Sequence, residues 1–107
     1  MIENEDETTD GGVVTDTETD TEIRHIPRYK VILHNDPKTT MDFVTHILMR
    51  FFEKDQMQAV KLMIQVHEKG FGIAGIYALE HAEFRVEQTL SLARTNSFPL
   101  SLSVEPE

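Results

Sequence analysis

Residues 29–52, which read YKVILHNDPKTTMDFVTHILMRFF, contain the pattern that decides the fold. The β-branched and aromatic run over 29–34 predicts a short strand, and Asn35-Asp36-Pro37 is a turn signal. Thr39 and Asp42 have the spacing of a capping box, so we expect a helix to begin there. The apolar face of this helix is marked at helical spacing by Met41, Val44, Ile47, Leu48, Phe51 and Phe52.

A second helix is predicted directly after the first. Asp55 is a suitable N-cap, because its carboxylate can accept a hydrogen bond from a free backbone N–H of the first turn. Lys69 and Gly70 are typical of a helix C-terminus, where a cation is favoured and glycine adopts the left-handed conformation. The apolar face of this helix consists of Ala59, Leu62, Met63 and Val66.

The remainder of the chain predicts a strand, a helix and a strand. Residues 71–77 form a strand pattern that two glycines weaken, and residues 79–94 carry the apolar stripe of a third helix. Ala78 offers this helix no side-chain cap, and residues 100–104 alternate as a half-buried strand does. The order β-α-α-β-α-β favours an α+β fold, with a small three-stranded, mostly antiparallel sheet and three helices on one face.

Charge is distributed unevenly along the chain. Residues 1–22 contain nine of the 19 Asp and Glu residues and no Lys or Arg, so they account for the whole net charge of −9. A segment this acidic and poor in apolar residues cannot offset its ordering entropy. We therefore predict a disordered tail over 1–22, a linker over 23–28 and a folded domain over 29–107. A domain without net positive charge is a poor nucleic-acid binder.

The sequence lacks the motifs of common catalytic and cofactor sites. It has no Cys, no phosphate-binding glycine loop and no Ser in a Gly-x-Ser-x-Gly elbow. The five His residues lack the spacings typical of metal sites, so we expect no enzyme activity, no cofactor and no metal. No apolar run approaches the ~20 residues that span a bilayer, and no signal peptide is visible. We therefore expect a cytoplasmic protein without membrane contact.

The segment HNDPKTTM, residues 34–41, has a structural interpretation as well as a functional one. Asn and Asp make turns and Thr caps helices, so the segment explains a local shape without any ligand. The same holds for Met63, Val66 and His67, because apolar residues on a helix usually belong to the core. Periodicity alone leaves both interpretations open.

Taken together, these segments resemble the ClpS adaptor family. The resemblance covers about 29–104 and depends on combining the Asn-Asp turn, the Leu-Met-x-x-Val-His helix and the Gly that follows it. The matching residues are Tyr29 to Leu33, Asn35, Asp36, Thr39, Met41 to Val44, Phe51, Phe52, Ala59, Leu62, Met63, Val66, His67, Gly70, Gly75, Glu80, Ala82, Glu83, Val86, Pro99 and Leu100.

The resemblance implies a function in regulated protein degradation. Members of this family bind N-degrons, which are substrates whose first residue is Leu, Phe, Tyr or Trp, and deliver them to a Clp AAA+ unfoldase. The resemblance implies that Asn35, Asp36 and His67 hold the α-amino group of the substrate, and that Thr39 shapes the rim. The implied walls of the pocket for the first side chain are Met41, Val44, Met63, Val66 and Leu100.

The resemblance also suggests a contact with the partner. Glu80 and Arg85, near the start of the third helix, are expected to face the N-terminal domain of the unfoldase, although a solvated helix face explains them equally well. Pro37 and Thr40, on the implied rim, depart from the family, which commonly has an acid and a Pro there. The alternative function is therefore a ClpS-like regulator with an altered pocket. A ribosome-associated module of similar shape is a third hypothesis, which the lack of net positive charge disfavours.

Overall fold

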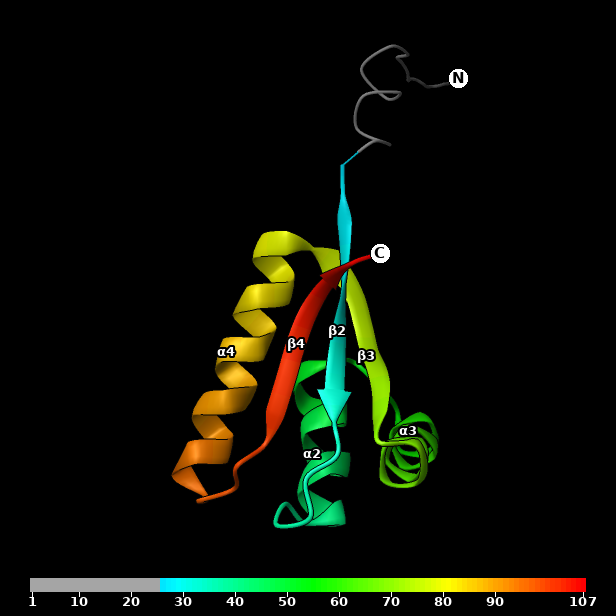
Figure 1. The fold of residues 1–107 in the computed structure, drawn as a ribbon, viewed down its shortest axis with the longest axis vertical. Helices are drawn as coiled ribbons and strands as arrows, with labels where there is room; N and C mark the ends of the chain where they lie inside the picture. The colour runs from blue at the N-terminus through cyan, green and yellow to red at the C-terminus, as the bar shows by residue number, and fades with distance from the viewer. Residues whose placement is uncertain (1–25) are drawn as a thin grey trace, which may run out of the picture.

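The computed structural model describes residues 26–107, which contain one three-stranded sheet and three helices (Figure 1). The elements are β2 (Arg28–His34), α2 (Met41–Phe51), α3 (Gln56–Lys69), β3 (Phe71–Ala78), α4 (Leu79–Thr95) and β4 (Ser101–Pro106). The predicted α+β fold and its order of elements are confirmed. The predicted tail, 1–22, and the first half of the predicted linker lie outside the described residues, and β2 begins inside that linker.

The central strand of the sheet is β2, and both of its neighbours run antiparallel to it in the order β3-β2-β4. Val31 on β2 lies opposite Gly75 on β3 and Val104 on β4. The register of β2 against β3 shifts after Val31, so Ala74 is an extra residue on β3 and forms a bulge. The sheet is therefore fully antiparallel, where the sequence predicted a mostly antiparallel one.

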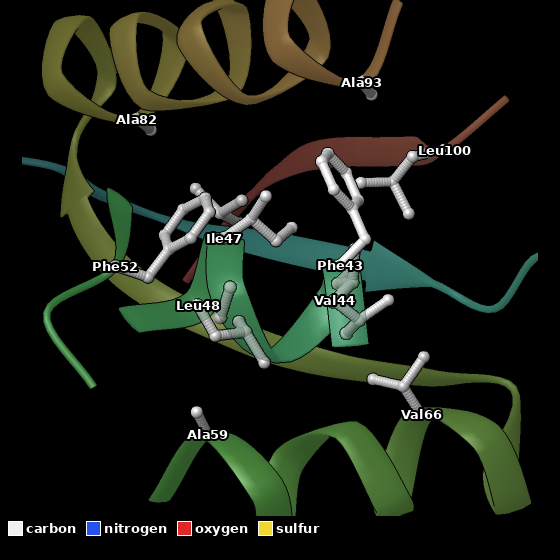
Figure 2. Close-up of a cluster of buried hydrophobic side chains, with 13 residues drawn as sticks. Phe43, Val44, Ile47, Leu48, Phe52, Ala59, Val66, Ala82, Ala93 and Leu100 are labelled. Atoms are coloured by element: carbon white, nitrogen blue, oxygen red, sulfur yellow. The ribbon is translucent and has the colours of Figure 1, made fainter. Parts of the chain in front are cut away.

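All three helices pack on one face of the sheet, and α2 lies between α3 and α4 (Figure 1 and Figure 2). Val31 and Leu33, two positions apart on β2, point to this face and are completely buried. The core comprises Val31, Leu33, Phe43, Val44, Ile47, Leu48, Phe52, Ala59, Val66, Ala74, Ala82, Ala93 and Leu100. Met41 belongs to the predicted apolar face of α2 but stays outside this core, with 48% of its surface exposed.

The N-cap of α2 is Thr40, not Thr39 as the capping-box spacing predicted. The Thr40 hydroxyl accepts a hydrogen bond of 3.1 Å from Phe43 N. Thr39 is instead buried, and its hydroxyl donates to Asp36 Oδ2 at 2.8 Å. The prediction was wrong by one residue because both positions carry a hydroxyl, and the conformation of the preceding loop decides which one caps the helix.

Both ends of α3 have the features that the sequence predicts. Asp55 Oδ1 accepts from Gln58 N at 2.8 Å, and the Gln58 side chain accepts in return from Asp55 N at 3.1 Å. This reciprocal pair is a capping box. At the other end Gly70 has a φ of 94°, which glycine adopts without steric cost, and its N–H donates to Val66 O at 2.8 Å. The last turn of α3 is thereby fixed.

Gly72 allows α3 to pack closely on β3. A Cβ atom at this position would lie 2.8 Å from Leu62 Cδ1 and 3.0 Å from Val66 Cγ2. Both distances are shorter than the ~3.5–4.0 Å of a normal carbon–carbon contact. The glycine that weakens the strand pattern therefore sets the separation between α3 and the sheet.

The third helix, α4, begins after Ala78 without a side-chain cap, as predicted. Its fully buried positions are Ala82, Thr89 and Ala93. Their small side chains, together with the hydrogen bond of 2.7 Å from the Thr89 hydroxyl to Arg85 O, allow the helix to lie close to the sheet. Asn96 ends the helix and donates from its side chain to Leu92 O at 2.9 Å.

Candidate functional site

A cavity of about 380 Å³ opens between the β2–α2 loop and the C-terminal half of α3. Its lining residues come from the loop, the first turn of α2 and one side of α3. They are Asn35, Asp36, Pro37, Thr39, Thr40, Met41, Val44, Met63, Val66 and His67. The structure therefore places around one cavity every predicted pocket residue except Leu100. It also places there Pro37 and Thr40, which the sequence located on the rim.

The carboxylate of Asp36 is held by its own loop. Its Oδ2 atom accepts hydrogen bonds from Lys38 N at 3.0 Å and from the Thr39 hydroxyl at 2.8 Å. Thr39 N also donates to Asp36 O at 3.2 Å, which closes the turn. No hydrogen bond to Asp36 Oδ1 is recorded within residues 26–107. Since an ionised carboxylate has about four acceptor sites, Asp36 retains capacity for a further donor.

The same loop is tied to the C-terminal end of α3. Asn35 N donates to Gly70 O at 2.9 Å, and Gly70 follows His67 by three residues. This bond brings the loop and the last turn of α3 together, so Asn35, Asp36 and His67 line one cavity. An amide, a carboxylate and an imidazole are thereby all part of the lining of the cavity.

The other part of the cavity is apolar. Val44 on α2 and Val66 on α3 have exposed fractions of 8% and 2%, and Figure 2 shows their side chains pointing toward each other. Met41 is half-exposed and Met63 is partly buried. Buried valines therefore form the interior, and two flexible thioether side chains lie nearer the solvent.

Leu100 lies in the core and is not among the residues that line the cavity. It directly precedes β4, which begins one residue later than predicted, at Ser101. In Figure 2 the Leu100 side chain lies beside Phe43, on the opposite side of α2 from Val66. The role of Leu100 as a pocket wall therefore stays a prediction.

The two predicted partner contacts differ in their surroundings. Glu80 is exposed in the first turn of α4. The Arg85 side chain is only 24% exposed; it donates to Phe51 O at 2.6 Å and to Glu53 Oε2 at 2.9 Å. Its guanidinium carbon lies 4.5 Å from the centre of the Tyr77 ring. Burial raises the pKa of Tyr77 above its ordinary value, and the Arg85 cation opposes that shift. Arg85 is thus engaged inside the domain.

Within residues 26–107, no group of three or more His, Asp or Glu side chains is arranged to hold a metal ion. None of the helices in this range has the length and apolar character needed to cross a membrane.

A family model described as ATP-dependent Clp protease adaptor protein ClpS matches residues 24–103. The match includes every residue that lines the cavity. The chain belongs to the ClpS family. The resemblance seen in the sequence is thereby confirmed, and the family description is that of an adaptor for a protease.

Several bacterial ClpS proteins are similar to this chain. The ATP-dependent Clp protease adapter protein ClpS of Myxococcus xanthus is 40% identical over 98 residues, which cover 92% of each chain. The ClpS of Desulfatibacillum aliphaticivorans is 47% identical over 79 residues, covering 74% of this chain and 76% of the relative. The ClpS of Shewanella pealeana is 48% identical over 86 residues, which cover 80% of this chain and 84% of the relative.

A solved structure has the same fold. It is that of Agrobacterium tumefaciens ClpS2 bound to L-phenylalaninamide, with a TM-score of 0.74 and 29% sequence identity. The similarity covers 78% of this chain and 100% of that one. The three-stranded sheet and its helices are therefore the fold of this family.

Proposed function

We propose that this protein is an adaptor that binds substrates by a free first residue, Leu, Phe, Tyr or Trp, and delivers them to a Clp AAA+ unfoldase for ATP-dependent degradation. The observation that carries the proposal is the cavity that joins an apolar interior to Asn35, Asp36 and His67. Membership of a Clp adaptor family supports the delivery step. The ligand of the Agrobacterium ClpS2 supports the substrate class, since phenylalaninamide has a free α-amino group beside a bulky apolar side chain.

The polar side chains suit an α-ammonium group. This group is a compact cation with three N–H donors, so it requires converging acceptors. Asp36 Oδ1, the Asn35 amide oxygen and a ring nitrogen of His67 are the proposed acceptors, since all three residues line the cavity. A hydrogen bond to a charged acceptor is about twice as strong as a neutral one. Acetylation removes the charge and two donors of the substrate, so an acetylated N-terminus leaves these acceptors unpaired.

The apolar interior suits a large first side chain. Full burial of a Leu or Phe side chain contributes roughly 1.5–3 kcal/mol. Met41 and Met63 are unbranched and adaptable, so the same cavity fits both aliphatic and aromatic side chains, and their sulfur atoms contact rings favourably. A β-branched first residue has its bulk next to Cα, where the polar side chains lie, and is expected to bind more weakly.

The charge at the site comes from a single acid. Asp36 is the only Asp or Glu among the lining residues, and its neighbours Pro37 and Thr40 are neutral. The attraction for the substrate ammonium therefore depends on one carboxylate. A pocket that fails to bind N-degrons despite this geometry would correspond to the alternative function, a ClpS-like regulator that binds the unfoldase.

The contact with the unfoldase is proposed at the first turn of α4. Glu80 is exposed there and is available to the N-terminal domain of the unfoldase. Arg85 stays a proposed part of this contact; its side chain also donates to Phe51 O and to Glu53, which links α4 to the end of α2. The proposed location is the cytoplasm.

A degradation assay tests this function. A fluorescent reporter whose first residue is Leu is incubated with a Clp AAA+ protease and ATP, with and without this protein. We expect several-fold faster loss of fluorescence with the protein, and no acceleration for an acetylated reporter. The Asp36→Ala variant should give no acceleration either. An adaptor that binds the unfoldase but leaves the Leu reporter intact would favour the alternative regulator.

A further inference from the structure

Helix α3 exposes an apolar stripe that its packing does not require. Met57 is 71% exposed, Ile64 is 45% exposed and Val60 is partly buried. These positions are three and four residues apart, so they lie on one side of the helix. The fully buried residues of α3, Ala59 and Val66, lie on another side. The core therefore does not explain why the stripe is apolar.

The stripe is continuous with the cavity described above. Met63 follows Val60 by three residues, and His67 follows Ile64 by three residues, so each pair consists of neighbours on the helix surface. Met63 and His67 both line the cavity. The far end of the stripe borders a shallow surface area, which is lined by Asp55, Gln56, Met57, Val60 and Lys61. One side of α3 therefore connects the cavity with this shallow area.

The length of the stripe suits a short extended peptide. His67 and Met57 are ten positions apart on α3, which corresponds to about 15 Å along a helix. An extended chain advances by about 3.3 Å per residue, so four to five residues span that distance. A substrate whose first residue fills the cavity would place its fifth or sixth residue beside Met57.

The direction of the substrate follows from the surroundings of the cavity. A chain leaving the mouth passes over the β2–α2 loop, the first turn of α2 or α3, because these segments line the site. The loop is polar over Asn35 and Asp36, and the start of α2 is polar at Thr40 and Asp42, apart from Met41, which lines the cavity itself. Of these segments, α3 is the one that extends the apolar surface away from the mouth.

We propose that Met57, Val60 and Ile64 form a second substrate subsite, which takes an apolar side chain at the fifth or sixth residue of an N-degron substrate. The subsite rests on the proposed function, because it requires the first residue to occupy the cavity. An unbranched methionine at its far end accommodates aliphatic and aromatic side chains alike. The adaptor thereby distinguishes substrates that share the same first residue.

Three labelled peptides test the subsite by fluorescence anisotropy on the full chain. Two are ten residues long, begin with Leu and carry either Leu or Ser at the fifth and sixth positions. The third, Leu-Ser-Ser, is too short to reach Met57 and measures the cavity alone. We expect the apolar ten-residue peptide to bind about fivefold more tightly than the Ser peptide, as partial burial of one apolar side chain predicts.

Variants separate the subsite from the cavity. Met57→Gln and Ile64→Gln should reduce the fivefold advantage to less than about twofold without changing the affinity for Leu-Ser-Ser. Leu79 on α4 is 39% exposed and lies outside the stripe. Leu79→Gln removes this apolar side chain and should leave the fivefold preference for the apolar ten-residue peptide unchanged.

Three results would overturn the subsite. If the two ten-residue peptides bound with equal affinity and Leu-Ser-Ser also bound, the subsite would be excluded and the proposed function would stand. If Ile64→Gln weakened the binding of Leu-Ser-Ser as much as that of the apolar ten-residue peptide, the stripe would only support the shape of the cavity. Absence of binding for Leu-Ser-Ser at any concentration would remove the proposed function and the subsite together.

Discussion

The hydroxyl of Thr39 donates a hydrogen bond of 2.8 Å to Oδ2 of Asp36. Thr39 is only 9% exposed, so this bond lies inside the loop, and Lys38 N donates to the same oxygen. Both bonds fix the rotation of the carboxylate and leave Oδ1 for another donor. Thr39 is therefore a positioning residue for the single charged acceptor of the proposed site.

Replacing Thr39 tests this arrangement. Thr39→Val keeps the shape of the side chain but removes the donor, so the Asp36 carboxylate loses one of its two loop contacts on Oδ2. We expect the affinity for a peptide with a free first Leu to fall about fivefold, or about 1 kcal/mol, because the carboxylate keeps the bond from Lys38 N and is only less firmly oriented. Thr39→Ser restores the donor and should restore the affinity. Equal affinities of the Val and Ser variants would show that Thr39 only fills space.

The charge of Asp36 gives a second prediction. Asp36→Asn replaces the carboxylate by an amide of the same shape, and we expect at least about tenfold weaker binding of a free first Leu. The remaining affinity should depend less on salt, because the ion pair is absent. Asp42→Asn makes the same charge change in the first turn of α2, outside the cavity, and serves as the control. Loss of affinity in both variants would indicate a general charge effect.

A third prediction concerns the size of the cavity. Gly72→Ala places a Cβ atom against Leu62 and Val66, and Val66 is a wall of the cavity. We expect the affinity for a first Trp to fall several-fold more than that for a first Leu, because displacement of Val66 narrows the interior. Gly75→Ala is the control, since its Cβ would meet the ring and hydroxyl of Tyr77, which does not line the cavity. Anisotropy titrations measure the ratio of the affinities for the Trp and Leu peptides. An unchanged ratio in Gly72→Ala contradicts the prediction.

The fourth prediction concerns Arg85. Arg85→Gln removes the donor to Phe51 O and the cation above Tyr77, so we expect the free energy of unfolding to fall by about 1–2 kcal/mol. The pair with Glu53 adds little to this value, because Glu53 is 68% exposed. Urea denaturation measures the change, and Arg94→Gln at an exposed position of α4 is the control. Unchanged stability together with weaker unfoldase binding would show that Arg85 serves as a partner contact and not as a structural link.

The features of the fold that depend on neighbouring residues could be predicted from the sequence. Asp55 and Gly70 mark the ends of α3 because capping and the left-handed conformation are local effects. The alternation over 100–104 predicted a half-buried strand for the same reason, and Leu102 and Val104 of β4 pack against the core.

Features that depend on distant contacts could not be predicted in this way. The Arg85 side chain turns inward because it meets Phe51 O, which is 34 residues away in the sequence. The exchange of roles between Thr39 and Thr40 depends on the conformation of the loop that holds Asp36. The cavity residues could be named from the family resemblance, but their convergence is produced by the bond between Asn35 N and Gly70 O.

The central claim is that the cavity recognises a free, bulky first residue that is not branched at Cβ, and four short labelled peptides test it most directly. They begin with Leu, Phe, Ile and acetyl-Leu and are titrated against the full chain by anisotropy. We expect saturable binding of the Leu and Phe peptides, weak binding of the Ile peptide and no binding of the acetyl-Leu peptide. Equal binding of all four, or of none, would contradict the account.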